Sequence, residues 1–258
     1  MTVYNEIGKG YSIHRKADPR IVESVYRLLD LPGKSLVIDV GAGTGNYSNA
    51  LADKGLVVYA IEPSKEMRSQ ATYNPGVSWL QGTAENMPFD DAVADGVIAL
   101  LSMHHFKSVE KASVEFDRIC GNGAMVIFTF DPRQSVQFWL SDYFPGIFNS
   151  AYSVFDPVKK VADALAGGKW RYEIIPFPLP GDLSDKFMAF GWKRPEAYLD
   201  AAIRNSMSAF ALADQTVVNI GINRLKNDLE TGTWNEKYGP IKELDEIDLG
   251  YRFIKLSR

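Results

Sequence analysis

The sequence predicts an α/β fold in which a mostly parallel sheet is covered by helices on both faces. Three observations support this prediction. Apolar strand-like runs alternate with helix-like segments through the first half of the chain, a glycine-rich turn (VGAGTG) follows the first of these runs, and the second half contains two further strand-like runs. Strands that alternate with helices are typical of parallel sheets, because each helix carries the chain back to the same end of the sheet.

The elements of the first half follow from their apolar patterns. The predicted strands are residues 35–40, 57–62, 77–82, 95–101 and 124–130, each a short apolar run. The predicted helices are residues 19–33, 46–55, 63–73 and 108–121, in which apolar residues recur at three-and-four spacing. The regular order of these elements predicts that residues 19–130 form one doubly wound, cofactor-binding core.

The second half is predicted to complete the sheet and to cover it. Residues 170–180 contain a sixth strand, and residues 247–258 contain a seventh. The stretches between them are too long to be plain loops in a compact domain, so we expect a helical insert over residues 131–169 and a second helical insert over 181–246.

Composition excludes several classes of function. The chain has 258 residues, a net charge of −4 from 28 basic and 32 acidic residues, and a single cysteine, Cys120. No disulfide framework or thiolate metal cluster can be built from one cysteine, so we expect no metal. The balanced charge predicts neither a nucleic-acid partner nor a membrane partner, and the polar N-terminus has no apolar signal core. These features predict a cytoplasmic protein.

The glycine-rich turn is a candidate ligand site. Gly41, Gly43 and Gly45 lie where the first strand meets the first helix of the core, which is where open α/β sheets bind ligands. A purely structural tight turn would also use glycine. Glu62 ends the second strand, where a carboxylate can accept hydrogen bonds from a ribose, and Asn46 stands where a dinucleotide fingerprint requires its third glycine.

Four ordered motifs, VIDVGAGTG, AIEPSKEM, GTAENMPFDD and ADGVIALLSMHHF, together resemble the class I S-adenosylmethionine-dependent methyltransferases, particularly the small-molecule group related to quinone biosynthesis. The resemblance implies a Rossmann-like sheet of seven strands in the order 3-2-1-4-5-7-6, with the seventh strand antiparallel. It also implies S-adenosylmethionine as cofactor and S-adenosylhomocysteine as product. The inserts would then cap the active site above the carboxyl ends of the strands.

The resemblance also assigns cofactor contacts by position. In the core they are Asp39, Gly41, Ala42, Gly43, Glu62, Pro63, Met67, Thr83, Ala84, Glu85, Leu100 and Leu101. Glu62 would hold the ribose hydroxyls and Met67 would pack on the adenine. Residues 1–18 resemble an N-terminal lid, in which Tyr11 and Arg15 stand four residues apart, and the arginine could reach the cofactor carboxylate.

Candidate acceptor and catalytic residues come from outside the glycine loop. The inserts are rich in aromatic residues, and a methyl-transfer pocket should be largely apolar because excluded water cannot compete for the methyl group. From these inserts we expect Trp139, Tyr143, Trp192 and Arg194 to bind the acceptor. His104 and His105 follow the fourth strand, where either could act as a general base near neutral pH or could cap the strand end.

Other functions remain open at this point. A non-catalytic protein that binds S-adenosylmethionine, or an accessory subunit, would share the same cofactor motifs. A methyltransferase for a modified tRNA base is a further alternative, although no basic patch with interleaved aromatic residues supports it. A nicotinamide-dependent oxidoreductase is disfavoured by Asn46. The sequence does not specify the acceptor, its reacting atom or the oligomeric state.

Overall fold

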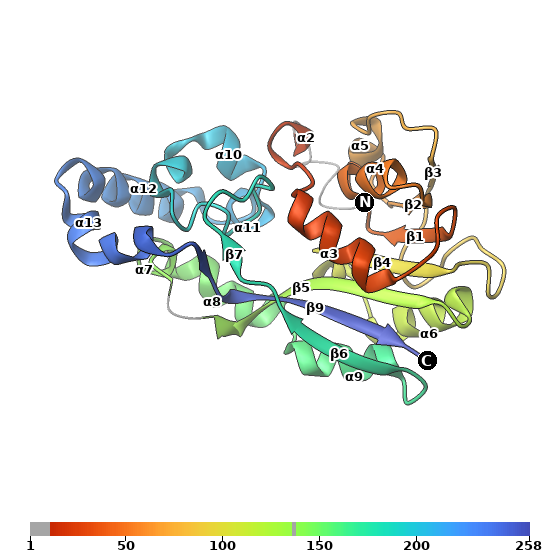
Figure 1. The fold of residues 1–258 in the computed structure, drawn as a ribbon. Helices are drawn as coiled ribbons and strands as arrows, with labels where there is room; N and C mark the ends of the chain where they lie inside the picture. The colour runs from red at the N-terminus through yellow and green to blue at the C-terminus, as the bar shows by residue number, and fades with distance from the viewer. Residues whose placement is uncertain (1–10, 136–137) are drawn as a thin grey trace.

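The centre of the protein is a seven-stranded sheet in the order β3-β2-β1-β4-β5-β9-β6 (Figure 1). The structure is a computed structural model that describes residues 11–135 and 138–258. The strands are β1 (Leu36–Val40), β2 (Val57–Ile61), β3 (Val77–Leu80), β4 (Gly96–Leu100), β5 (Ala124–Ser135), β6 (Arg171–Pro176) and β9 (Leu249–Ser257). Strand β9 pairs antiparallel with both β5 and β6. The predicted order is therefore confirmed, with β9 as the seventh strand of the main sheet.

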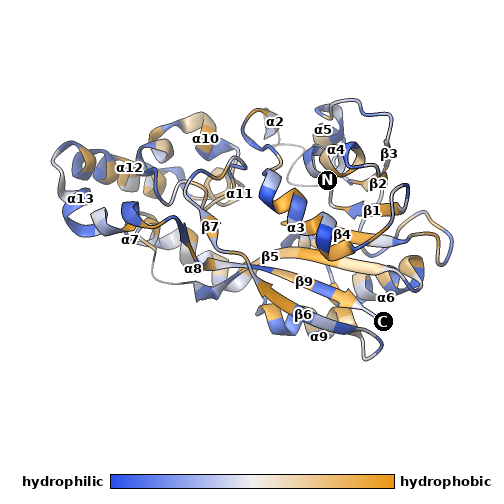
Figure 2. Cartoon of the chain, viewed as in Figure 1, coloured by the Kyte–Doolittle hydropathy of each residue, from blue (hydrophilic) through white to orange (hydrophobic). Residues whose placement is uncertain are grey.

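The central strands are mainly apolar because helices cover both of their faces. Helices α3 (Pro19–Leu29) and α4 (Asn46–Asp53) pack on one face, and α6 (Val109–Cys120) and α9 (Val158–Ala166) pack on the other (Figure 1). Figure 2 shows the apolar character of most of β5 between these layers; its last residues, from Asp131 to Ser135, are mainly polar. The short helix α5 (Lys65–Ser69) follows β2, and its first turn is capped by the Ser64 hydroxyl.

Helix α3 shows how local sequence fixes an element of the core. The Asp18 side chain accepts a hydrogen bond from the backbone N–H of Arg20, and Pro19 occupies the first helical turn, where its missing N–H is not needed. The helix ends at Asp30, whose left-handed conformation stops it. Asp18 also accepts hydrogen bonds from Ser184, so this cap ties the N-terminal part of the chain to the second insert.

A separate helical layer lies beyond the carboxyl ends of the parallel strands (Figure 1). We call residues 138–155 and 181–245 the cap. Its helices are α7 (Leu140–Tyr143), α8 (Pro145–Val154), η2 (Pro195–Leu199), α10 (Ala201–Asn205), α11 (Ser208–Ala211), α12 (Gln215–Glu230), α13 (Thr233–Tyr238) and η3 (Gly239–Glu243). The rings of Trp139 and Trp234 meet edge to face with centroids 5.5 Å apart, so aromatic packing forms the cap's own core.

The boundaries of the inserts differ from the expectation in three respects. Strand β5 continues to Ser135, past the expected end at residue 130, and α9 belongs to the sheet's helical layer although it lies in the first insert. The expected sixth strand is divided: β6 ends at Pro176, the Phe177 N–H still donates to the Tyr251 carbonyl oxygen of β9 at 3.0 Å, and the pairing with β9 stops there. The remainder, β7 (Leu179–Pro180), pairs with β8 (Glu246–Ile247) in a small second sheet. Within the described ranges, no helix is long and apolar enough to cross a bilayer.

Candidate functional site

The glycine loop after β1 has a backbone that other residues could not adopt without strain. Gly41, Gly43 and Gly45 all have positive φ angles, of 74°, 61° and 78°. A Cβ on Gly41 would lie 2.6 Å from the Cβ of Ser102, and one on Gly45 would lie 2.4 Å from the Trp79 ring. A Cβ on Gly43 would meet only the Met67 methyl group, at 3.5 Å. Neighbouring side chains thus fill the space beside Gly41 and Gly45, whereas the space beside Gly43 is open.

A cavity of about 630 Å³ lies in front of this loop, and we call it the loop cavity. Its wall contains nearly every residue that the resemblance assigned to the cofactor: Tyr11, Arg15, Gly41, Ala42, Gly43, Glu62, Pro63, Met67, Thr83, Ala84, Glu85, Leu100 and Leu101. The carboxyl ends of β1, β2 and β4 bring these residues together from separate parts of the chain. Asp39 is the exception.

Glu62 is held rigidly at the end of β2 with its carboxylate facing the loop. Its Oε2 accepts a hydrogen bond from the Gly43 N–H at 3.0 Å, and its Oε1 accepts one from the Ser64 N–H at 2.7 Å. Burial raises the pKa of Glu62, and these two hydrogen bonds oppose the rise. Each carboxylate oxygen can accept a second hydrogen bond, so Glu62 keeps acceptor capacity for a ligand in the loop cavity.

Asp39 is buried beneath the loop and does not line the cavity. Its Oδ2 accepts a hydrogen bond of 2.6 Å from the Ser48 hydroxyl of α4. Burial raises the pKa of Asp39 to about 7, and the nearby Glu62 charge adds to the rise while Ser48 opposes it. The structure therefore places Asp39 where it supports the strand-to-helix turn, rather than on the cavity wall where we expected it.

Part of the loop cavity's wall is apolar. Met67 from α5 and Ala84 are both buried, as an adenine-packing surface requires. The Glu85 carboxylate lines the cavity but already accepts a hydrogen bond from the Lys107 N–H at 2.6 Å. Glu85 thus also fixes the start of the segment that leads into α6.

The N-terminal lid is tied to the cap and to the glycine loop by one buried cluster. Helix α2 (Tyr11–His14) opens the described part of the lid, and Arg15 follows it. The Arg15 guanidinium pairs with the Asp185 carboxylate of the cap, and the Tyr47 hydroxyl donates to Asp185 at 3.0 Å. The Asn46 side-chain amide donates to the Arg15 carbonyl oxygen. Asn46, which replaces the third glycine of a dinucleotide fingerprint, therefore anchors the lid.

Arg15 stays charged in this cluster although little of it is exposed. Burial alone would lower its pKa, but Asp185 and its hydrogen bonds raise the pKa of the guanidinium well above its usual value. Sequence reasoning missed Asp185 and Tyr47. Asp185 lies in an irregular stretch of the second insert, and no pattern around it indicates that it reaches residues 170 positions away.

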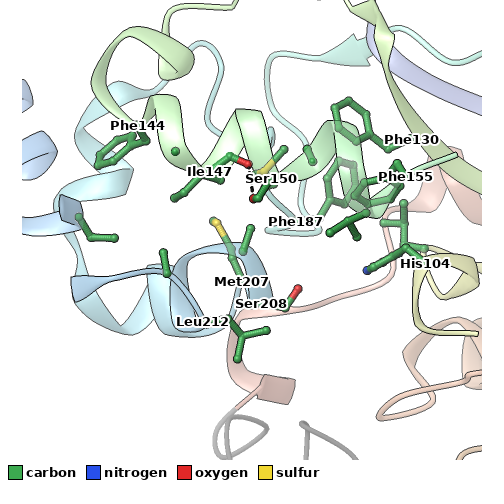
Figure 3. Close-up of a pocket in the computed structure, with 18 of the residues that line it drawn as sticks. His104, Phe130, Phe144, Ile147, Ser150, Phe155, Phe187, Met207, Ser208 and Leu212 are labelled. Carbon is green, nitrogen blue, oxygen red and sulfur yellow. Dashed lines mark hydrogen bonds between the residues drawn. The ribbon is translucent and has the colours of Figure 1, made fainter. Parts of the chain in front are cut away.

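A second cavity, of about 610 Å³, lies under the cap, and we call it the apolar cavity. Figure 3 shows Ile147 and Ser150 of α8 on one side, with Met207, Ser208 and Leu212 opposite them. Phe130, Phe155, Phe187 and His104 close one end. The Ser150 hydroxyl donates to the Ile147 carbonyl oxygen at 2.7 Å, so even this polar side chain is satisfied within its own helix.

The two cavities meet beside the end of β4. Tyr11, Arg15, Leu101 and His105 line both of them. Leu101 has a positive φ of 51°, which is unusual for a branched residue and carries strain. Its backbone N–H donates to the Phe128 carbonyl oxygen at 2.7 Å, which holds this conformation at the junction.

The two histidines lie at this junction, in the 3₁₀ turn η1 (Met103–His105). The rings of His104 and His105 have centroids 3.8 Å apart, and His104 also contacts the Phe155 ring at 4.5 Å. Burial lowers the pKa of His104 well below 6.5, with His105 and Arg15 adding to the effect, and lowers the pKa of His105 to about 4. Both side chains are neutral at pH 7. Their pKa values therefore lie below the range near neutrality that we expected for a general base. The buried Nδ1 of His104 has no partner among the described residues.

The four residues expected to bind the acceptor lie elsewhere in the cap. Trp139 donates from its indole N–H to the Trp192 carbonyl oxygen at 2.7 Å, and Trp192 donates to the Pro180 carbonyl oxygen at 3.1 Å. The Tyr143 hydroxyl donates to Asp228 at 2.8 Å, and Arg194 donates to the Leu183 carbonyl oxygen at 2.8 Å. None of the four lines either of the two cavities. Aromatic content alone could not separate the cap's core from its cavity wall.

The loop cavity fits the cofactor that the sequence motifs imply. The open side of Gly43 gives a ligand access to bare backbone, Glu62 offers acceptors for a diol, and Met67 and Ala84 offer a surface for a flat base. In the parts of the chain that the structure describes, no group of three or more His, Cys, Asp or Glu side chains could hold a metal ion.

Comparison with known proteins agrees with this geometry. A family described as "Methyltransferase domain" matches residues 38–128. The chain is similar to a solved putative methyltransferase from an antibiotic biosynthesis pathway of Anabaena variabilis, with 48% identity, a TM-score of 0.93, and coverage of 95% of this chain and 99% of that one. With this fold, this glycine loop and this relative, the chain belongs to the class I S-adenosylmethionine-dependent methyltransferases.

Other relatives match over less of their length or at lower identity. An uncharacterized methyltransferase of Geobacillus is 27% identical over 141 residues, which are 52% of this chain and 66% of that protein. This chain spans between about a third and two thirds of the first curated relatives it matches. The chain is also similar to phosphoethanolamine N-methyltransferase 2 of Haemonchus contortus, solved with S-adenosylmethionine, with a TM-score of 0.58 and 15% identity. The alignment covers 99% of this chain and 56% of that one, and at this identity it shows only that the two proteins share a fold. The narrower resemblance to quinone biosynthesis stays a prediction.

Proposed function

We propose that this protein transfers the methyl group of S-adenosylmethionine to a small-molecule acceptor that binds in the apolar cavity. The observation that carries the proposal is the junction of the two cavities. Leu101 and His105 belong to both walls, so ligands in the two cavities would meet beside the end of β4. A transfer enzyme needs this arrangement, because holding two reactants together can supply about 7 to 11 kcal/mol of the barrier.

The chain's own residues are proposed to bind and orient the cofactor. When bound, S-adenosylmethionine supplies a methyl group on a positively charged sulfur, and displacement by the acceptor's lone pair leaves S-adenosylhomocysteine. Glu62 would accept hydrogen bonds from the ribose hydroxyls, and the backbone at Gly43 would lie against the ligand. Arg15, already held by Asp185, closes the lid side of the loop cavity.

The cap is proposed to select the acceptor and to exclude water from it. The cavity wall includes four phenylalanines, namely Phe130, Phe144, Phe155 and Phe187, in place of the aromatic residues that we expected from the sequence. The description of the Anabaena relative as part of an antibiotic pathway supports a metabolite as acceptor here. The net charge of −4 does not favour a nucleic-acid acceptor, and we propose that the enzyme acts in the cytoplasm.

Two measurements on the full chain test this function. Isothermal titration calorimetry should detect S-adenosylhomocysteine binding and no binding of NAD at the same concentration. Incubation with methyl-labelled S-adenosylmethionine and a metabolite extract should then transfer label to a small molecule. Binding of NAD instead would overturn the cofactor assignment. Cofactor binding without any label transfer, over a broad set of extracts, would favour a non-catalytic binding protein.

A further inference from the structure

The apolar cavity carries almost no net charge that an ionic acceptor could use. Among the described residues of its wall, the charged side chains are Arg15 and Asp214. Arg15 is already paired with the buried Asp185, and Asp214 lies at the exposed start of α12, where it caps the Thr216 N–H at 2.8 Å. A buried ionic group of the acceptor would therefore lose its hydration without gaining an unpaired counter-charge.

Hydrogen-bonding groups gather at the cofactor end of the same cavity. His104 is neutral there, its ring centroid lies 4.5 Å from that of Phe155, and its buried Nδ1 has no partner among the described residues. Figure 3 shows a nitrogen of the His104 ring turned toward the cavity. His105 lines both cavities beside it. A neutral imidazole can accept a hydrogen bond from an O–H or N–H group, or donate one, without a charge on the ligand.

Part of the cavity wall is apolar and exposed to solvent. Leu212 is 59% exposed, Val217 of α12 is 47% exposed, and Val154, which directly precedes Phe155, is 48% exposed; all three line the cavity. Apolar side chains therefore line the cavity both at the buried junction and at the surface. This arrangement suits a ligand whose apolar body is longer than the buried part of the cavity.

We propose that the acceptor is an uncharged, elongated and mainly apolar molecule with one hydrogen-bonding group at its reactive end. That group lies beside His104 and His105 at the junction with the loop cavity. The apolar body passes between α8 and the segment from Met207 to Val218, and its far end lies against the exposed side chains of Leu212 and Val217. This inference rests on the proposed function, because it assigns the apolar cavity to the acceptor.

A series of simple probes tests the inference with the wild-type protein. Calorimetry with S-adenosylhomocysteine alone comes first, followed by titration of the loaded protein with 4-alkylphenols that carry three to seven alkyl carbons. Affinity should rise about fourfold for each added methylene, the value for apolar surface removed from water. The 4-alkylbenzoates and 4-alkylbenzylamines of equal length, which carry a charge in place of the phenol, should bind at least about tenfold more weakly.

A pair of alanine variants checks that the probes occupy this cavity. Ala209 lines the cavity and Ala211, on the same short helix α11, does not. Ala209→Phe should lower the affinity for the longer alkylphenols by about tenfold or more and leave S-adenosylhomocysteine binding unchanged, whereas Ala211→Phe should leave both unchanged. Should Ala209→Phe fail to fold, the wild-type chain-length series still decides the question.

The outcomes separate this inference from the proposed function. Benzoates or benzylamines that bind as tightly as the phenols, or phenol affinities that do not depend on chain length, would overturn the uncharged apolar acceptor. Binding of S-adenosylhomocysteine with no binding of any phenol would also overturn it, while the cofactor assignment stands. Absence of S-adenosylhomocysteine binding would overturn both.

Discussion

Removal of the Asp185 carboxylate should release the N-terminal lid. The Asp185 side chain is 1% exposed and that of Arg15 is 14% exposed, so Asp185→Ala leaves a nearly buried guanidinium without its counter-charge. Loss of one partner of such a buried pair costs about 3 to 5 kcal/mol. Because Arg15 keeps some contact with solvent and the lid can open, we expect about 3 kcal/mol, the low end of that range.

Limited digestion with trypsin measures this change directly, because Arg15 and Lys16 are cleavage sites within the lid. If opening is fast relative to cleavage, a loss of about 3 kcal/mol raises the cleavage rate about 150-fold. The matched control is Asp182→Ala, three residues away. Asp182 pairs with Arg20 at the surface, where it is 83% exposed, so its removal should cost about 1 kcal/mol or less. Equal cleavage rates in the two variants would refute the buried tether between lid and cap.

Three further predictions concern the loop cavity and the histidines. Glu62→Ala should weaken S-adenosylhomocysteine binding by about 1.5 to 3 kcal/mol in calorimetry. The control Glu66→Ala, nearby on α5 and outside the cavity wall, should not weaken it, and equal effects of the two variants would contradict the ribose contact. Gly43→Val should abolish S-adenosylhomocysteine binding in a protein that still unfolds cooperatively. Residue 43 has a positive φ and open space in front of it, so the valine side chain would face the ligand. Normal binding by this variant would place the ligand elsewhere. Because the histidine pKa values are lowered in the folded protein, the unfolded chain binds more protons than the folded one between about pH 4 and 6.5. The free energy of unfolding should therefore fall as the pH drops through this window, and it should fall less in His104→Asn. An identical pH dependence in that variant would contradict the buried neutral His104.

The histidine role in catalysis is a separate question for kinetics. A general base at His104 or His105 would lower turnover by about 100-fold on replacement by Asn, with cofactor affinity unchanged. Because both side chains are neutral at pH 7, the corresponding inflection should lie below pH 6.5 rather than near neutrality. A strand-end cap would instead show a loss of stability, with the shape of the pH profile unchanged.

The core was predictable because its signals are local. Alternating apolar strands and amphipathic helices predicted the elements of the core, the resemblance to the methyltransferases implied the strand order, and the glycines and Glu62 were found from their positions at strand ends. Asp39 shows the limit of this reasoning. A position in a motif does not say whether a side chain faces the ligand or supports the turn from below, and here the Asp39 carboxylate accepts a hydrogen bond from Ser48 of α4.

The cap was less predictable because its contacts connect distant segments. Trp139 and Trp192 are aromatic residues in the right inserts, yet their indole groups bond to backbone carbonyls inside the cap. The wall of the apolar cavity instead takes residues such as Phe187 and Met207, whose surroundings in the sequence look no different. Asp185 bonds to Arg15 across 170 positions of sequence, so no local pattern could indicate the pair.

Label transfer to apolar metabolites tests the central claim most directly. The full chain is incubated with methyl-labelled S-adenosylmethionine and an extract of metabolites, and the label is counted after partition into an organic solvent. The account predicts label in the organic phase that depends on the protein and is strongly reduced in Glu62→Ala and in Ala209→Phe, but not in Ala211→Phe. Label confined to nucleic acid or to charged, water-soluble products, or equal transfer by the Ala209→Phe variant, would contradict it.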